Sequence, residues 1–204
     1  MFANWALGEI NKNNKINTIL DVGSGIGKHS RLFARYGKNV IAVDIADSDN
    51  ENYNHGDILF VISDFMKFDM SVKVDCVWVS HLLEHQPNIN LFLKKCLSLL
   101  KEGGLMAITV PPAKNQIVGG HLTVWNAGLV MYNLILAGTS CRHAHIKRYG
   151  YNISVIVQYE PITLPKLKYD NGDIESLSKF FPNGHNYQGF NGDIDYLCTF
   201  PSTC

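Results

Sequence analysis

Three glycines and one aspartate lie close together in ILDVGSGIGKHSRLF, residues 19–33. Gly23, Gly25 and Gly27 separate an apolar run from a helix-like pattern, so the backbone there can approach a ligand closely. The third glycine comes one position too early for the dinucleotide pattern GxGxxG, and no P-loop Gly-Lys-Ser/Thr follows. Asp21 precedes the loop, and its carboxylate would repel a pyrophosphate but attract an ammonium group. The pattern DxGxGxG therefore suits a ligand with an amino-acid-like end.

Two further acids follow expected strands. Asp44 ends VIAVD, where an acid can accept hydrogen bonds from ribose hydroxyls. Asp64 lies in SDF and could accept from an adenine amino group, with Phe65 beside the ring. The ordinary alternatives are a tight turn at the glycines, a solvated strand-end acid at Asp44, and a turn cap at Asp64. Ribose, adenine and an amino-acid end together describe S-adenosylmethionine.

Histidines supply the expected proton acceptor. Methyl transfer to oxygen or nitrogen is helped by loss of a proton, and a histidine with a near-neutral pKa is the common base. His81 follows an expected strand at the edge where ligands bind in such sheets. His121 follows PPAKNQIVGG, and Trp125 comes four residues later at an expected helix start, so both should face one pocket. We expect His81 or His121 to be the base, His85 to pack under the loop, and no metal ion to be needed.

In this order, the motifs resemble those of the class I S-adenosylmethionine-dependent methyltransferases. LDVGSGIG is similar to their first motif, VIAVD to their ribose-binding segment and SDF to their adenine segment. VDCVWVSHLLEHQPN resembles the "LEH" stretch of the small-molecule branch, and LLKEGGLMAITVP resembles their next strand. The resemblance covers residues 17–111 and implies S-adenosylmethionine as cofactor and S-adenosylhomocysteine as product. The implied cofactor contacts are Asp21, Gly23, Ser24, Gly25, Gly27, Asp44, Ile45, Ser63, Asp64, Phe65, Ser80 and His81.

The elements that position these residues alternate between strand-like and helix-like patterns, as in a parallel α/β sheet. Only Gly150 and Tyr151 separate the last two strands, so these strands must form an antiparallel hairpin. Gly103 and Gly104 are expected to form a turn between a helix and the fifth strand, and the links 45–56 and 65–73 are too short for full helices. The expected strands are 17–22, 39–44, 57–62, 74–80, 104–111, 141–149 and 152–160, and the expected helices are 27–36, 88–100, 123–137 and a short one near 173–181.

The resemblance also implies an α/β, Rossmann-like three-layer sandwich. Its sheet would have seven mostly parallel strands in the order 3-2-1-4-5-7-6, with an antiparallel C-terminal hairpin. We expect one domain over residues 1–204, in which 1–15 form an N-terminal helix or lid, 16–160 the core and 161–204 a C-terminal flap.

The composition fits a folded protein with an apolar core, with 46% hydrophobic and 18% charged residues and a formal net charge of zero. Nucleic acid is an unlikely partner because no basic excess is present. No signal peptide or membrane-spanning run of about 18 apolar residues is visible, so we expect a cytoplasmic protein with no membrane partner. The scattered cysteines are expected to be free thiols in a reducing compartment: Cys76, Cys96, Cys141, Cys198 and Cys204.

The expected function is S-adenosylmethionine-dependent methyl transfer to an oxygen or nitrogen of a small-molecule or sugar-like acceptor. The alternatives are a protein or RNA methyltransferase and a non-catalytic S-adenosylmethionine-binding regulatory subunit. The sequence gives no indication of the oligomeric state.

Overall fold

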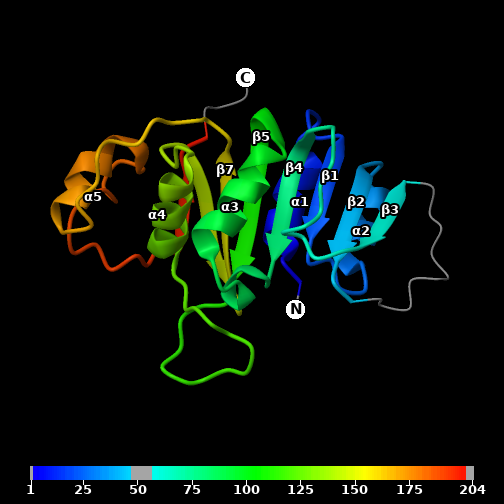
Figure 1. Cartoon of the computed structure of the whole chain (residues 1–204), viewed down its shortest axis with the longest axis horizontal. Helices are drawn as coiled ribbons and strands as arrows, with labels where there is room; N and C mark the ends of the chain where they lie inside the picture. The colour runs from blue at the N-terminus through cyan, green and yellow to red at the C-terminus, as the bar shows by residue number, and fades with distance from the viewer. Residues whose placement is uncertain (1, 47–56, 201–204) are drawn as a thin grey trace.

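The computed structural model describes residues 2–46 and 57–200 and is built around an eight-stranded sheet in the order β3-β2-β1-β4-β5-β7-β6-β8 (Figure 1). The first five strands of this order are parallel, and the last three add antiparallel pairs. The predicted order is therefore confirmed, and β8 is an edge strand that the sequence analysis missed. The strands are β1 (Thr18–Val22), β2 (Asn39–Asp44), β3 (Ile58–Ile62), β4 (Val74–Ser80), β5 (Leu100–Val110), β6 (Ala144–Tyr149), β7 (Asn152–Gln158) and β8 (Tyr196–Cys198).

Helices cover both faces of the sheet because successive strand side chains point to opposite sides. Cys76 and Trp78 of β4 share a core with α1 and α2, whereas Val77 and Val79 share the other core with α3 and α4. The residues of both cores are buried. The helices are α1 (Asn4–Lys12), α2 (Lys28–Arg35), α3 (Ile89–Ser98), α4 (Ala127–Ala137) and α5 (Gly172–Leu177), with short 3₁₀ turns η2 (Leu83–His85) and η3 (Ser178–Phe180).

The expected turn at Gly103 and Gly104 was wrong. Both glycines lie within β5, whose register against β4 shifts after Val74. Residues 101–104 form the resulting irregularity, and a Cβ on Gly104 would lie 2.9 Å from the backbone oxygen of Asp75. A bulged strand thus uses the glycine pair that the sequence pattern assigned to a turn.

The helix expected over 123–137 begins later, at Ala127. Asn126 is its N-cap, because its side chain accepts a hydrogen bond from Leu129 N at 2.8 Å. His121 and Trp125 therefore lie in the extended loop before the helix, and the helical spacing argued for them was wrong.

The C-terminal part follows the expectation with shorter strands. The hairpin of β6 and β7 is confirmed, although β6 begins at Ala144 rather than at residue 141. The short helix near 173–181 is present as α5 and η3, and the link 65–73 contains only turns and bends. Most of the link 45–56 lies outside the described residues, as does Cys204. The other cysteines have free thiols.

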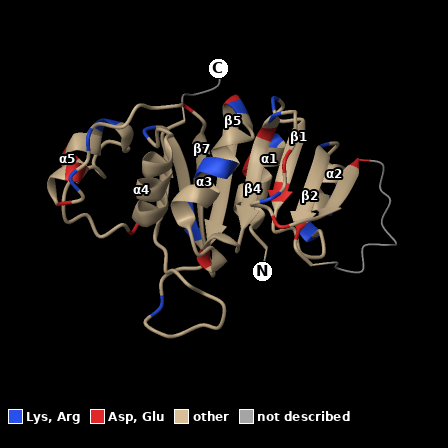
Figure 2. Cartoon of the chain, viewed as in Figure 1, with Lys and Arg blue, Asp and Glu red and all other residues tan. Residues whose placement is uncertain are grey.

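Among the described residues, the positions of basic and acidic residues are interspersed along the helices, strands and loops (Figure 2). Within the two described ranges, no helix is both long and apolar enough to cross a bilayer.

Candidate active site

The expected ligand residues meet along one edge of the sheet, where the carboxyl ends of the parallel strands lie. The loop from β1 to α2 carries the glycines, β2 ends at Asp44, β3 is followed by Ser63 and Asp64, and β4 ends at Ser80. The long loop between β5 and α4 extends beyond the same edge (Figure 1, green). Four strand ends and two loops thus border one candidate site.

The glycine loop bends through three left-handed positions. Gly23, Gly25 and Gly27 have φ angles of 71°, 53° and 70°. A Cβ on Gly23 would lie 2.7 Å from the Leu82 side chain, and one on Gly27 would lie 2.7 Å from the Phe60 ring. A Cβ on Gly25 would meet no atom within 4 Å. The first and last glycines are therefore packed, whereas the middle one borders open space.

Asp44 holds this loop from the end of β2. Its carboxylate accepts hydrogen bonds from Gly25 N at 2.7 Å and from Ala46 N at 3.0 Å. A carboxylate offers about four acceptor positions, so these two bonds use roughly half of them. Ile45, the next residue, is 76% exposed. Asp44 thus orders the glycine loop and can still accept from a ligand.

Asp21 is buried beneath the loop, with 2% of its surface exposed. Burial raises the pKa of its carboxyl from 3.8 to about 6, the charge of Asp44 adds to the rise, and the hydrogen bond from Ser30 Oγ at 2.5 Å opposes it. An ionised Asp21 is therefore costly unless a cation comes near.

His81 follows β4 with a strained φ of 54°. Its Nε2 lies 2.8 Å from Asn152 Oδ1, and Asn152 Nδ2 donates to Phe2 O, so Oδ1 must accept and Nε2 must carry a proton. Its Nδ1 lies 3.5 Å from Glu84 Oε1. Burial alone would lower the pKa of His81, but the bonds with Glu84 and Asn152 raise it overall. Both ring nitrogens face acceptors, which favours the protonated ring.

Two expected adenine contacts have partners within the protein. Asp64 Oδ1 accepts from Met66 N at 2.9 Å, which is the turn cap that the sequence analysis gave as its alternative role. The ring of Phe65 packs against Phe92 of α3, with centroids 5.4 Å apart. Ser63 N donates to Asp44 O at 2.8 Å and joins the ends of β2 and β3.

His121 and Trp125 line a hollow of about 220 Å³ despite the missing helix. Tyr151 and Lys114 also line it, with Lys114 Nζ 4.4 Å from the centre of the Tyr151 ring. The His121 ring meets that of His85 edge-on at 5.0 Å. The loop after β5 thus places a partly exposed histidine and an apolar hollow next to each other.

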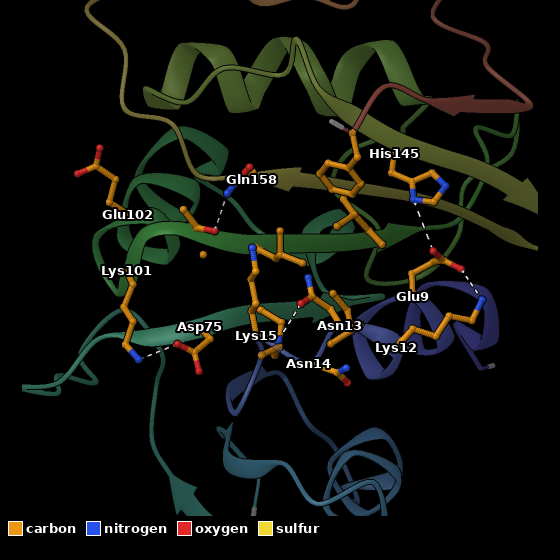
Figure 3. Close-up of a pocket in the computed structure, with 17 residues that line it drawn as sticks. Glu9, Lys12, Asn13, Asn14, Lys15, Asp75, Lys101, Glu102, His145 and Gln158 are labelled. Carbon is orange, nitrogen blue, oxygen red and sulfur yellow. Dashed lines mark hydrogen bonds and ion pairs between the residues drawn. The ribbon is translucent and has the colours of Figure 1, made fainter. Parts of the chain in front are cut away.

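A larger groove of about 870 Å³ lies at the opposite edge of the sheet (Figure 3). Lys101 Nζ pairs there with Asp75 Oδ1 at 2.6 Å, and Glu9 bridges Lys12 and His145. None of the expected ligand residues lines this groove. The candidate site is therefore the glycine-loop edge rather than the larger hollow.

Sequence reasoning missed Glu84 and Asn152 as residues of the site. It expected His85 to pack under the loop, whereas the His85 side chain is 40% exposed and contacts Gly120 O through Nδ1. Glu84 and His85 stand in HLLEHQ, three and four residues after His81. The chain turns at His81 and continues into η2, so the Glu84 carboxylate lies near both histidine rings. That spacing was a readable signal. Asn152 lies on β7, 71 residues after His81 in the chain, so no local sequence pattern could have predicted that the two residues meet.

Comparison with known proteins agrees with this geometry. Residues 20–108 match a family model described as a methyltransferase domain. A ubiquinone biosynthesis O-methyltransferase of Coxiella burnetii is 33% identical over 134 residues, covering 59% of this chain and 53% of that protein. The chain thus spans about half the length of that curated relative.

Two solved structures share the fold. The DhpI–SAH complex has a TM-score of 0.63 at 18% identity, covering 78% of this chain and 84% of that one. The 1,6-didemethyltoxoflavin-N1-methyltransferase of Burkholderia thailandensis has a TM-score of 0.61 at 16% identity, covering 78% and 77%. Together with the strand order and the glycine loop, these matches support a class I S-adenosylmethionine-dependent methyltransferase domain over residues 20–108.

Proposed function

We propose that the chain binds S-adenosylmethionine at the glycine-loop edge and transfers the methyl group to an oxygen or nitrogen of a small acceptor. The single observation that carries the proposal is the hydrogen bond between Gly25 N and the Asp44 carboxylate. Gly25 borders open space, and Asp44 holds the glycine loop while it can still accept hydrogen bonds from a ligand. When bound, the cofactor supplies a methyl group already activated on a sulfonium. The protein's part is then to bind, orient and exclude water.

The residues present fit such a cofactor. The open space at Gly25 lets a ligand lie against bare backbone, and Asp44 is the proposed ribose acceptor. Ser80 Oγ is buried and has no hydrogen-bond partner within the described part of the chain, so a bound ligand would satisfy it. Asp21 is proposed to stabilise the ammonium group. The remaining proposed contacts are Gly23, Ser24, Gly27, Ile45, Ser63, Asp64, Phe65 and His81.

The hollow beside His121 suits a flat, largely apolar acceptor. Trp125 and Tyr151 contribute aromatic walls, and Lys114 supplies a positive charge at the rim. At about 220 Å³ the hollow is smaller than the roughly 300–1,000 Å³ of drug-sized sites, which favours a small molecule over a folded macromolecule. The names of the matched O- and N-methyltransferases support the same class.

The two candidate histidines have different proposed roles. His121 opens onto the hollow, so we assign it the task of promoting loss of the acceptor's proton. His81 has acceptors at both ring nitrogens, so its proposed role is to hold the end of β4 and contribute a positive charge.

The test is release of S-adenosylhomocysteine from a panel of small phenols, catechols, amines and sugars. We expect turnover with at least one flat hydroxylated or amino acceptor. His121→Ala should lower that turnover by about 100-fold and leave cofactor affinity within twofold. Cofactor binding without turnover on any acceptor would favour the non-catalytic regulatory subunit, and unchanged turnover in His121→Ala would remove its assigned role.

Gly25→Ala tests directly whether a ligand lies against the glycine loop, and Gly37→Ala is its matched control. Both glycines have a positive φ, and an added Cβ meets nothing within 4 Å at either. Each alanine should therefore cost a similar 1–2 kcal/mol or so in backbone strain, measured by urea unfolding. Only Gly25→Ala should weaken S-adenosylmethionine binding, by tenfold or more in calorimetry. Equal affinities in the two variants would mean that no ligand lies against Gly25.

A further inference from the structure

Three side chains that could hold a metal ion converge beside the proposed acceptor hollow. Glu84 and His85 belong to the 3₁₀ turn after β4, and His121 belongs to the loop after β5. One carboxylate oxygen and one ring nitrogen from each histidine lie within 4.8 Å of one another. The three residues come from separate segments, so their meeting is a property of the fold.

Glu84 is the first sign that the cluster has a ligand. Its side chain is 1% exposed. Oε1 lies 3.5 Å from His81 Nδ1 and 3.9 Å from His85 Nε2. Oε2 is buried and receives no hydrogen bond from any residue in 2–46 or 57–200. A buried carboxylate oxygen without a donor is costly, and a cation beside it removes that cost.

His85 is already oriented as a ligand. Its Nδ1 lies 2.7 Å from Gly120 O. A carbonyl oxygen can only accept, so Nδ1 carries the proton and the lone pair is on Nε2, the nitrogen that faces Glu84. A backbone carbonyl that fixes the far nitrogen of an imidazole is the usual support of a metal-bound histidine.

The loop that carries His121 is tied to the same turn. Leu122 N donates to Glu84 O at 2.8 Å, and Thr123 N donates to the same oxygen at 3.3 Å. These bonds bracket His121 against the turn, together with the Gly120–His85 contact. The cluster is therefore held by backbone contacts on both sides.

The geometry points to a divalent transition-metal site formed by Glu84, His85 and His121. Two imidazoles and one carboxylate form a ligand set that suits zinc and neighbouring transition metals better than magnesium or calcium, which favour oxygen ligands. Ligand atoms about 2.1 Å from one ion lie at most about 4.2 Å apart, so a small turn of the His121 ring closes the site. Three protein ligands leave a position open for a small molecule, as in catalytic sites.

The role of this ion rests on the proposed function, whereas its binding does not. His121 also lines the acceptor hollow, so the open position faces that hollow. An ion there would hold an oxygen of the acceptor and favour loss of its proton to solvent water. His121 then acts through the ion rather than as a base, which refines its assigned role.

Cobalt(II) is the probe, because its visible absorption reports imidazole and carboxylate ligation. Untagged full-length protein is stripped with a chelator and titrated with cobalt(II), then with zinc(II). We expect one equivalent to bind and zinc to displace it. Glu84→Gln and His121→Asn should each weaken binding at least tenfold, whereas the control His185→Gln, in the C-terminal segment, should bind as wild type. The absence of a ligation spectrum, or equal affinities in all four proteins, would overturn the site.

A second titration, with S-adenosylmethionine and the stripped protein, separates this inference from the proposed function. Cobalt binding with no cofactor binding keeps the metal site and rejects the proposed function. Cofactor binding and turnover in chelator, with no cobalt spectrum, keeps the function and rejects the site. His121→Asn keeps the test decisive if Glu84→Gln does not fold, because His121 lies in a partly exposed loop.

Discussion

Asp44→Ala is expected to weaken S-adenosylmethionine binding about 100-fold, or about 2.7 kcal/mol. The proposed ribose bonds are made to a charged acceptor, and such bonds contribute about 1.5–3 kcal/mol. The same carboxylate holds Gly25 N at 2.7 Å, so its loss also loosens the glycine loop. Calorimetric titration with S-adenosylmethionine and S-adenosylhomocysteine measures the change, which should be similar for both because both carry the ribose.

Asp44→Asn and Asp57→Ala complete the experiment. The amide of Asp44→Asn keeps one oxygen that can still accept a hydrogen bond from Gly25 N. The affinity of this variant for both ligands should therefore fall between those of wild type and Asp44→Ala. Asp57 is an exposed acid that immediately precedes β3, at the end of that strand away from the candidate site. Its removal should leave the affinity for both ligands unchanged. An Asp44→Ala protein that binds both ligands as wild type would disprove the ribose role.

Asp21→Asn is expected to act in opposite directions on stability and on cofactor binding. At pH 8 the buried Asp21 is ionised at a cost, because its folded pKa of about 6 lies above the ordinary aspartate pKa of 3.8. Removing the charge should therefore stabilise the ligand-free protein by about 1–3 kcal/mol. The same change removes the proposed partner of the ammonium group and should weaken S-adenosylmethionine binding at least tenfold.

The pH dependence has a definite sign. A raised acid pKa gives stability that is fully present below about pH 4 and is lost as pH rises through about 6. The advantage of Asp21→Asn should thus disappear as pH falls from 8 to 4 in urea unfolding. Ser30→Ala is the matched control, since losing the bond to Asp21 should destabilise the protein at pH 8. An asparagine variant less stable than wild type at pH 8 would contradict the pKa assignment.

Local patterns predicted most of the sheet because its strands are short, apolar and bounded by glycine or acid. β2 and β4 have the expected bounds, and the two-residue link of the hairpin left only antiparallel pairing. The bulge at Gly104 was not predictable, because it depends on the Asp75 backbone of a neighbouring strand. The edge strand β8 was missed because a three-residue segment among glycines and aromatics has no readable period.

The candidate site could be predicted where the residue type and its position at a strand end together indicate one role. Asp44 and the glycines lie where the pattern placed them. The histidines were harder, because their roles depend on contacts from distant segments. Asn152 fixes the proton on His81, and Gly120 fixes the one on His85. Those partners come from β7 and from the loop after β5, so a pattern along one segment contains no information about them.

Isothermal titration of the wild-type protein with S-adenosylmethionine and with S-adenosylhomocysteine tests the central claim most directly. We predict that both ligands bind with a stoichiometry of one, and that S-adenosylmethionine binds more weakly as pH falls through about 6, where Asp21 takes up a proton. Absence of heat and of displacement for both ligands would contradict the assignment of this edge as the methyl-donor site.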